Sequence, residues 1–403
     1  MIKNRDFIIV GLQALDSRIG SNCINIAYEI AKNNRVLYVN YPLDRLTAWR
    51  ERKDPLIQKR KRILKGEEPD LIQINDNMWN LYPRTMLESI SQLPINFLFD
   101  FLNKINNKRF AREIQKAIDQ LGFKDYIIFN DSDMFRSFYL KELLKPKTYV
   151  YYTRDNMIAV DYWKTQGIRI EAQLMAKSDL VVANSTYLAE LARKYNPHSY
   201  YVGQGCDVTL FDKKLIKEIP EDIKNIKKPI IGYIGALLSL RLDLDVLVYI
   251  ATKRPDWSIV LVGPEDEAFK NSTLHQLENV HFLGPKKMEE LPAYLYAFDV
   301  AINPQKLNEV TIGNYPRKID EYLAMGKPTV QTKTKAMEVF EGYVYLAETK
   351  EDYVYLIDKA LKENTPEKEA EREKLARSHT WENNVKEIYN KIEMIEALKN
   401  KAQ

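Results

Sequence analysis

The chain has 403 residues, which is enough for two domains of about 200 residues each. Hydrophobic residues make up 45% and charged residues 29%, as is typical of a soluble globular protein, and the longest apolar runs have the length of strands rather than of a transmembrane helix. The two cysteines and four histidines are too few for a disulfide framework or a metal cluster. The composition therefore favours a cytoplasmic protein without a structural metal.

The net charge of +4 is unevenly distributed along the chain. Residues 1–200 contain 31 Lys and Arg against 23 Asp and Glu, which gives a balance of +8. The remaining residues contain 29 against 33, which gives −4. The first half is therefore the part of the chain that is suited to an anionic partner.

Apolar strands alternate with helical patterns in the first part of the chain. Because strands that are separated by helices pair in parallel, this alternation predicts a doubly wound α/β sheet. An apolar run begins near the N-terminus, but Asp6 and the lack of a cleavage site favour a buried strand over a signal peptide. The expected strands are 7–10, 36–39, 71–74, 127–129, 149–152 and 180–183, and the expected helices include 23–32, 107–120 and 171–177.

A second α/β region follows a polar stretch that begins after Phe211. This stretch is rich in Lys and Glu and contains two prolines, so it predicts a linker. Strands resume near residues 230, 259, 280 and 300, and a helical pattern from Trp381 closes the chain. We therefore expect one domain over residues 1–212, a second over 213–380 and a final helix over 381–403.

The stretch from Tyr315 to Thr332 is the most informative part of the sequence. A proline at its start suits the first turn of a helix, and Gly326 allows the chain to turn before a strand. Lys318 and Glu321 are three residues apart and so share one face near the start of this helix, where the helix dipole favours an anion. The pattern fits a phosphate on Lys318 and sugar hydroxyls on Glu321; an ordinary surface pair is the alternative.

The same stretch resembles the nucleotide-sugar-binding element of the GT-B glycosyltransferases of the group 1 superfamily. This resemblance implies two Rossmann-like, doubly wound domains that face a cleft, with the acceptor bound by the first domain and the nucleotide-sugar donor by the second. It also implies that the final helix crosses back to the first domain. The further segments that match this family, in order along the chain, are 178–185, 203–211, 231–238, 256–264, 279–292 and 298–304.

The resemblance implies a donor site in the loops of the second domain. Gly235 and Ala236 form a turn at which the backbone can approach a diphosphate, and Arg241 can neutralise that group. Glu321 matches the glutamate that holds the ribose hydroxyls. Eight residues earlier the family has another glutamate, whereas this chain has Gly313, which leaves the sugar and the stereochemistry open. The other residues expected at the donor are Gly284, Lys286, Glu309, Thr311 and Lys318, and Asn308 lies in the same loop.

Polar residues that follow strands of the first domain are candidates for the acceptor site. Asp155 comes just after a strand, at the edge where open α/β sheets bind ligands, and its carboxylate could be the base of sugar transfer. Capping of the next turn is the alternative role, and Asp133 is a rival base, as is Asp131. The residues expected to bind the acceptor are Gly20, Ser21, Asn22 and Asp131, although a helix cap explains Ser21 equally well.

A basic stretch over residues 45–65 contains nine basic and two acidic residues. Trp49 and Leu56 lie within it, and an aromatic-rich segment follows at residues 93–102. Together these segments predict contact with an anionic membrane; a solvated loop and a core helix are the alternative. We expect no nucleic acid partner, because the basic stretch carries no nucleic-acid-binding signature.

The sequence thus predicts a glycosyltransferase that needs no metal or other cofactor. It would move a sugar from a nucleotide diphosphate to a glycan or lipid-linked acceptor in cell-surface polysaccharide synthesis, at the cytoplasmic face of a membrane. Two alternatives stay open. One is a catalytically inactive interaction protein with this fold, which Gly313 favours, and the other is a sugar-nucleotide epimerase, which needs no acceptor.

Overall fold

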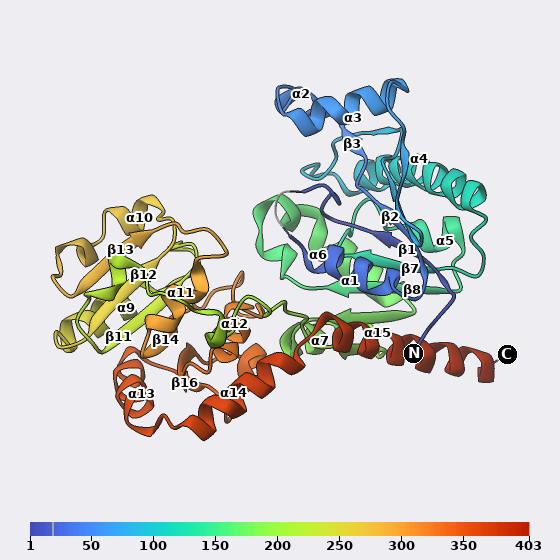
Figure 1. Ribbon diagram of the computed structural model, residues 1–403. Coiled ribbons are helices and arrows are strands. Elements are labelled where there is room, and N and C mark those ends of the chain that lie inside the picture. The colour runs from blue at the N-terminus through green and yellow to red at the C-terminus, as the bar shows by residue number, and fades with distance from the viewer. Residues whose placement is uncertain (18–19, 403) are drawn as a thin grey trace. The chain divides into compact units, whose positions relative to one another are not determined.

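The computed structural model describes residues 1–17 and 20–402, which form two compact units (Figure 1). Unit 1 contains the residues up to Gly203 together with the C-terminal segment from Trp381, and unit 2 contains Gln204–Thr380. The division thus precedes the boundary expected at residue 212. Val208 and Phe211 are buried in the core of unit 2, which is why this segment belongs there.

Unit 1 is built on an eight-stranded sheet with the order β10-β9-β8-β7-β1-β2-β5-β4. The strand order reverses between β1 and β7, which are hydrogen-bonded neighbours, so the ligand-binding crevice of a doubly wound sheet is expected outside their carboxyl ends. The strands are β1 (Asp6–Val10), β2 (Arg35–Val39), β4 (Leu71–Asn75), β5 (Met78–Leu81), β7 (Ile127–Asp131), β8 (Thr148–Thr153), β9 (Leu180–Ala183) and β10 (Ser199–Tyr201), and β3 (Leu43–Asp44) pairs with β6 (Met86–Leu87) outside the sheet.

The prediction that residues 71–74 form a parallel strand was wrong in its direction. β4 pairs antiparallel with β5, which the sequence analysis did not include, and β5 in turn pairs parallel with β2. Only Asp76 and Asn77 separate β4 from β5, and a connection this short can join only antiparallel strands. The Asp-Asn turn was the signal that could have revealed this hairpin.

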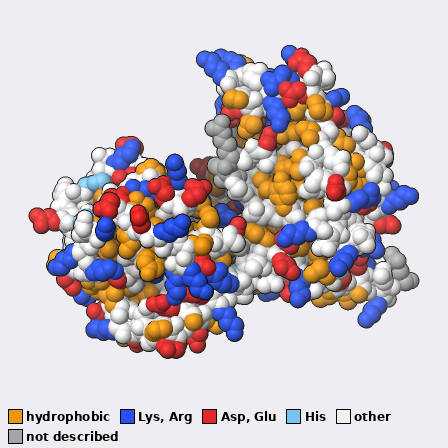
Figure 2. Space-filling view, viewed as in Figure 1, with side chains coloured by type: hydrophobic (Ala, Val, Ile, Leu, Met, Phe, Trp, Pro, Cys, Tyr) orange, Lys and Arg blue, Asp and Glu red, His pale blue; other side chains and the backbone are white. Residues whose placement is uncertain are grey.

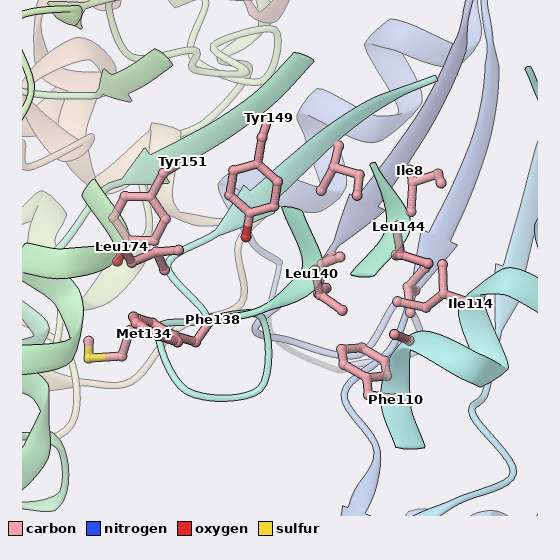
Figure 3. Packing of buried hydrophobic residues seen from close by; sticks show 14 of the residues in the cluster. Ile8, Phe110, Ile114, Met134, Phe138, Leu140, Leu144, Tyr149, Tyr151 and Leu174 are labelled. Atoms are coloured by element: carbon pink, nitrogen blue, oxygen red, sulfur yellow. The ribbon is translucent and has the colours of Figure 1, made fainter. Parts of the chain in front are cut away.

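Helices cover both faces of the sheet of unit 1, and alternate residues of each strand contact them. Ile8 and Val10 of β1 pack with α4, α5 and α6, as Figure 3 shows for part of this cluster, whereas Phe7 and Ile9 pack with α1 and α15 on the opposite face. The helices are α1 (Asn22–Ala31), α2 (Arg45–Arg50), α3 (Pro55–Lys65), α4 (Asn96–Leu121), α5 (Leu140–Leu144), α6 (Asp161–Lys177), α7 (Thr186–Arg193) and α15 (Trp381–Ala402), with a 3-10 turn at Met157–Ala159.

Helix α4 is eleven residues longer at its start than the helix expected from residue 107. Three asparagines interrupt the apolar pattern there, yet their side chains are buried and hydrogen-bonded. Asn106 exchanges two 2.9 Å hydrogen bonds with the backbone of Glu88, and Asn107 donates to the carbonyl of Phe135. These hydrogen bonds to residues distant in sequence allow the asparagines to be buried, although the sequence pattern predicted no helix there.

Unit 2 contains a six-stranded sheet in which every neighbouring pair is parallel. Its order, β13-β12-β11-β14-β15-β16, is the 3-2-1-4-5-6 order of a doubly wound fold when the strands are counted within the unit. The order reverses between β11 and β14. The strands are β11 (Ile230–Ile234), β12 (Ser258–Val262), β13 (Val280–Gly284), β14 (Val300–Asn303), β15 (Thr329–Thr332) and β16 (Tyr345–Ala347).

Helices also cover both faces of the second sheet. One hydrophobic cluster joins the sheet to α11, α12 and α14, and the other joins it to α9 and α13. The helices are α8 (Glu221–Lys224), α9 (Leu244–Lys253), α10 (Glu267–Lys270), α11 (Leu291–Ala297), α12 (Lys318–Ala324), α13 (Lys350–Glu363) and α14 (Pro366–Ser378), with 3-10 turns at Lys213–Leu215, Thr273–Gln276 and Lys335–Phe340. Among the helices that the structure describes in either unit, none combines the length and apolarity needed to cross a membrane.

Candidate functional site

Three glycines follow or end neighbouring strands of unit 2 at their carboxyl ends. Gly235 follows β11, Gly263 follows β12 and Gly284 ends β13. Gly235 and Gly263 have φ angles of +142° and +151°, and a side chain on Gly263 would overlap the carbonyl oxygen of Gly235. Only glycine tolerates this backbone, so the ends of β11 and β12 present peptide groups without side chains, and β11 is one of the two strands between which the order reverses.

The ammonium group of Lys318 lies directly over the Gly235 turn. A Cβ atom on Gly235 would stand 2.6 Å from Lys318 Nζ. This nitrogen donates a hydrogen bond to the hydroxyl of Tyr233 and lies 3.9 Å from the centre of its ring. Within the described part of the chain, no carboxylate forms an ion pair with Lys318, so its charge is available to an anion at the turn.

Glu321 lies one helical turn after Lys318 on α12. Burial raises the pKa of its carboxyl group, and the nearby charge of Lys318 opposes this shift. The next residue fixes the helix in place, because the hydroxyl of Tyr322 accepts a 2.9 Å hydrogen bond from the N–H of Ile234 at the end of β11. The structure therefore places Lys318 at the Gly235 turn, with Glu321 one helical turn further along α12.

The loops after β11 and β14 are joined by hydrogen bonds next to this turn. Asn308 donates from Nδ2 to the carbonyl of Leu240 at 2.8 Å, and the N–H of Lys306 donates to the carbonyl of Arg241. The side chain of Thr311 is buried, and its hydroxyl donates to the carbonyl of Lys306. Thr311 thus stabilises the loop, and its hydroxyl is not presented to a ligand. By contrast, Ala236, Arg241 and Glu309, which were also expected to bind the nucleotide sugar, are exposed.

Among the described residues, no interaction holds Lys286 at the Gly235 turn. Its amine forms a 2.6 Å ion pair with Asp222 and lies 5.0 Å from the centre of the Tyr294 ring. The hydrogen bond to Asp222 raises the pKa of Lys286. A donor phosphate would have to compete with this carboxylate for the lysine.

In unit 1, an arginine connects two of the candidate aspartates. Arg154 follows β8 and donates from Nε to Asp131 at 2.9 Å and from Nη1 to Asp155 at 3.2 Å. The charge of Asp131 raises the pKa of Arg154. Asp131 is fully buried, whereas the carboxyl-bearing side chain of Asp155 is 45% exposed. Of these two carboxylates, only that of Asp155 is open to a substrate.

The third candidate, Asp133, is held within its own loop. Its carboxylate accepts from Arg136 Nε at 2.8 Å and from the N–H of the same residue at 3.1 Å, and the side chain is fully buried. Burial and this ion pair remove Asp133 from contact with an acceptor hydroxyl. The geometry therefore favours Asp155 over both rivals.

The expected acceptor residues at the start of α1 have mainly structural partners. Ser21 is the N-cap of α1, its Oγ accepts from the N–H of Ile24 at 3.3 Å, and its side chain is buried. Asn22 donates to the hydroxyl of Tyr152 at 3.3 Å, and Gly20 is exposed. The preceding residues, 18 and 19, lie outside the described part of the chain.

Comparison with known proteins identifies relatives of the chain. The family model described as "Glycosyl transferases group 1" matches residues 228–363. A Bacillus subtilis (strain 168) protein named "Putative teichuronic acid biosynthesis glycosyltransferase TuaH" is 28% identical over 226 residues, which cover 52% of this chain and 56% of that protein. The aligned part therefore spans little more than half the length of this curated relative.

Solved structures resemble the chain over nearly its whole length. Anabaena Alr3699/HepE in complex with UDP has a TM-score of 0.64 at 14% identity, covering 97% of this chain and 100% of that one. Sucrose-phosphate synthase from Thermosynechococcus elongatus has a TM-score of 0.60 at 14% identity, covering 99% and 98%. The chain has the GT-B fold, and its residues 228–363 match the group 1 glycosyltransferases.

Two residues of this GT-B protein that the sequence analysis did not single out complete the candidate sites. Tyr233 holds the amine of Lys318, and Arg154 orients Asp155. Arg154 directly precedes Asp155 and follows a strand, and this position was a signal that it could contact a ligand-binding edge. Its contact with Asp131 could not be read from the sequence. Among the described residues, no three His, Cys, Asp or Glu side chains form a group that could hold a metal ion.

Proposed function

We propose that the protein is a glycosyltransferase that takes its sugar from a nucleotide diphosphate donor bound in unit 2. The position of Lys318 Nζ over the Gly235 turn is the observation that carries this proposal. The family match over residues 228–363 supports it, as does the fold shared with Anabaena Alr3699/HepE, whose structures contain UDP and UDP-glucose.

In the proposed donor complex, the diphosphate lies at the Gly235 turn and Glu321 accepts hydrogen bonds from the ribose hydroxyls. When the bond between the anomeric carbon and the diphosphate breaks, negative charge develops on the departing phosphate. Lys318 and the backbone amides of the turn stabilise that charge, and Arg241 adds a second positive charge from the same loop. This arrangement supplies charge stabilisation from side chains, so we propose that transfer needs no metal ion and continues in EDTA.

We propose Asp155 as the base that takes the proton from the acceptor hydroxyl while the hydroxyl oxygen bonds to the anomeric carbon. Its exposed carboxylate is held by Arg154. Asp155→Asn keeps the shape but removes the base, so turnover should fall about a hundredfold or more with donor affinity nearly unchanged. Turnover that survives in Asp155→Asn but is lost in Asp133→Asn would show that the base is assigned to the wrong residue.

The proposed acceptor is a glycan or a lipid-linked glycan in cell-surface polysaccharide synthesis, at the cytoplasmic face of a membrane. Similarity to a protein named for teichuronic acid biosynthesis supports this class. Exposed Trp49 lies on α2, exposed Phe97 and Phe101 lie on α4, and Figure 2 shows basic side chains over α2 and α3. Two residues of the basic stretch do not fit a membrane surface, because Arg60 is buried and Lys59 is paired with Asp16.

A thermal-shift screen against UDP-, GDP- and ADP-sugars tests the proposal most directly, because a ligand that binds the native state raises Tm. The stabilising donor is then incubated with and without candidate acceptors, and the products are separated. Transfer only with acceptor supports a glycosyltransferase. Conversion of the donor to an isomer without acceptor would indicate an epimerase, and no stabilisation by any donor would indicate the inactive interaction protein.

A further inference from the structure

Arg60 on α3 is a buried cation that has no carboxylate partner in the described part of the chain. Its side chain is 7% exposed, and Nη1 is buried with no hydrogen-bond partner among the residues that the structure describes. The neighbouring Lys59, by contrast, forms a 2.9 Å ion pair with Asp16. A buried charge without an anion is costly, so the partner that balances Arg60 is expected to come from outside the chain.

A second guanidinium group lies at the same aromatic ring. The guanidinium carbons of Arg60 and Arg136 are 4.1 Å and 4.9 Å from the centre of the Tyr41 ring. Stacking on an aromatic ring offsets only part of the cost of burying a cation. Tyr41 follows β2 and Arg136 follows β7, so both residues lie at the carboxyl edge of the sheet, where doubly wound folds bind ligands.

The charged side chains around Arg60 at this edge form ion pairs with one another. Arg136 is balanced by Asp133 through Nε, and Lys59 is balanced by Asp16. Among the described residues, Arg60 is therefore the cation of this group that has no carboxylate partner. Because Asp133 engages Arg136 through Nε and the backbone, the terminal nitrogens of Arg136 have no hydrogen bond within the described part of the chain.

A hollow of ≈ 400 Å³ lies beside Arg136, although Arg60 itself does not line it. Pro42, the residue after Tyr41, lines it, and so does Arg136. Its volume lies in the range of small-molecule sites. The wall combines aromatic rings with polar and charged side chains; these residues include Phe135, Tyr162, Trp163, Asn103 and Gln92, and also Asp44, Arg50, Glu51 and Glu88. Glu88 is paired with Arg45 and Arg109, and Asp44 caps α2. The aromatic and polar part of this wall suits a sugar or an apolar chain.

We infer that Arg60 and Arg136 bind a phosphate group of the acceptor and that the rest of the acceptor lies in this hollow. Guanidinium groups bind phosphate through paired, charge-assisted hydrogen bonds, which would satisfy the orphan Nη1 of Arg60. Assignment of the ligand as the acceptor rests on the proposed function, whereas binding of the phosphate does not. The phosphate can belong to a soluble sugar phosphate or to an isoprenyl carrier, and the experiment separates these sources.

The test is calorimetric titration of the full-length protein with two phosphates and their neutral counterparts. Glucose 1-phosphate is compared with glucose, and farnesyl phosphate with farnesol, the latter two in detergent micelles. We expect the protein to bind at least one of the two phosphates. Arg60→Gln should weaken the affinity for that phosphate at least about tenfold and leave the affinity for its neutral counterpart unchanged. Arg60→Lys keeps the charge but loses the paired N–H groups of the guanidinium. Its phosphate affinity should lie between those of the natural sequence and Arg60→Gln.

Lys61→Gln provides the matched control, since it removes one positive charge from the next residue of the same helix. It should bind both phosphates as the natural sequence does. Equal phosphate affinity in Arg60→Gln and the natural sequence, or no phosphate binding by either, would overturn the inference. A loss shared by Lys61→Gln would also overturn it, because it would indicate a diffuse electrostatic effect.

Thermal unfolding distinguishes a ligand-binding role from a structural one. Without ligand, Arg60→Gln should unfold at or above the Tm of the natural sequence, because an unbalanced buried charge has been removed. A lower Tm with unchanged phosphate affinity would show that Arg60 only supports the fold. Nucleotide-sugar binding is measured on the same samples: phosphate binding through Arg60 without any donor binding would overturn the proposed function but not this site.

Discussion

At the scale of single residues, the donor site depends on a lysine and a glutamate whose surroundings differ. Lys318 stands over a glycine turn with the hydroxyl of Tyr233 as its hydrogen-bond partner. Glu321 is partly buried, and this burial raises the pKa of its carboxyl group. Both side chains are partly exposed, so a ligand at the turn can reach them.

Replacing either residue with alanine should weaken nucleotide-sugar binding. We expect Lys318→Ala and Glu321→Ala each to cost about 1–3 kcal/mol, the scale of a charge-assisted hydrogen bond. Calorimetry with the stabilising donor measures this loss, and Lys362→Ala on the exposed face of α13 is the control. Unchanged affinity in both folded variants would remove Lys318 and Glu321 from the donor site.

A buried glutamate in unit 1 makes stability depend on pH. Glu171 on α6 accepts a 2.7 Å hydrogen bond from the hydroxyl of Tyr151, and burial raises its pKa to about 7. Because the folded-state pKa lies above the unfolded one, the folded protein binds the extra proton. The resulting stability is fully present below about pH 4.5 and is lost as the pH rises through about 7.

Glu171→Gln should remove this dependence, since the amide oxygen can still accept from Tyr151 and has no charge to bury. Between pH 5 and 8, the free energy of unfolding should fall in the natural sequence relative to Glu171→Gln by on the order of 2–3 kcal/mol. Urea unfolding at several pH values measures the difference. Glu382→Gln, at an exposed position of α15, should leave the pH dependence as it is. If the unfolding free energy of Glu171→Gln follows the same pH dependence as that of the natural sequence, the assignment to Glu171 is wrong.

At the scale of elements, the C-terminal helix is part of the first core although it lies far away in sequence. Ile388 and Ile392 of α15 are buried with Phe7 and Tyr38 in the cluster that α15 shares with α1, and Figure 1 shows the two helices on the same side of the sheet. Polar contacts fix its position, because Glu396 accepts hydrogen bonds from Arg5 at 3.1 Å and from Thr148 at 2.9 Å.

Shortening the buried side chains of α15 should therefore destabilise unit 1. We expect Ile388→Ala and Ile392→Ala each to cost about 2–5 kcal/mol, because each leaves a cavity in a closely packed core. The exposed Lys386→Ala on the same helix should change stability by less than about 0.5 kcal/mol. Urea midpoints compare the three variants, and equal midpoints would mean that α15 contributes little to the core.

At the scale of the whole molecule, basic and apolar side chains are exposed together on unit 1. Trp49 is 66% exposed, and Phe97 and Phe101 are 76% and 63% exposed. Arg50, Arg52 and Lys53 lie beside Trp49 in sequence and are also exposed. Aromatic side chains that enter a lipid interface and cations that attract its charge would act together there.

Sedimentation with liposomes tests this surface. Binding should rise with anionic lipid and fall with salt, because each basic residue near such a membrane contributes on the order of 1 kcal/mol. Charge reversal at Arg50, Arg52 and Lys53 should abolish most of the binding, whereas reversal at Lys270, Lys359 and Lys362 in unit 2 should not. Equal binding to neutral and anionic vesicles would contradict an electrostatic surface.

The sequence by itself determined the doubly wound sheets and the Lys318–Glu321 pair. Strands such as β1, β2 and β11 are buried on both faces, so they appear as continuous apolar runs between helical periods. Helical spacing alone places Lys318 and Glu321 on one face. Both inferences need only neighbours along the chain, which is why the fold class and the family resemblance could be predicted.

Only the tertiary structure decided which polar residues are accessible. Asp131, Asp133 and Asp155 follow strands in the same way, but Arg154 lies 23 residues from Asp131 and buries it in an ion pair. Arg60 appeared to be one more charge in a basic stretch until packing placed it against Tyr41. Burial and ion pairing depend on partners that are distant in sequence, and local patterns do not specify those partners.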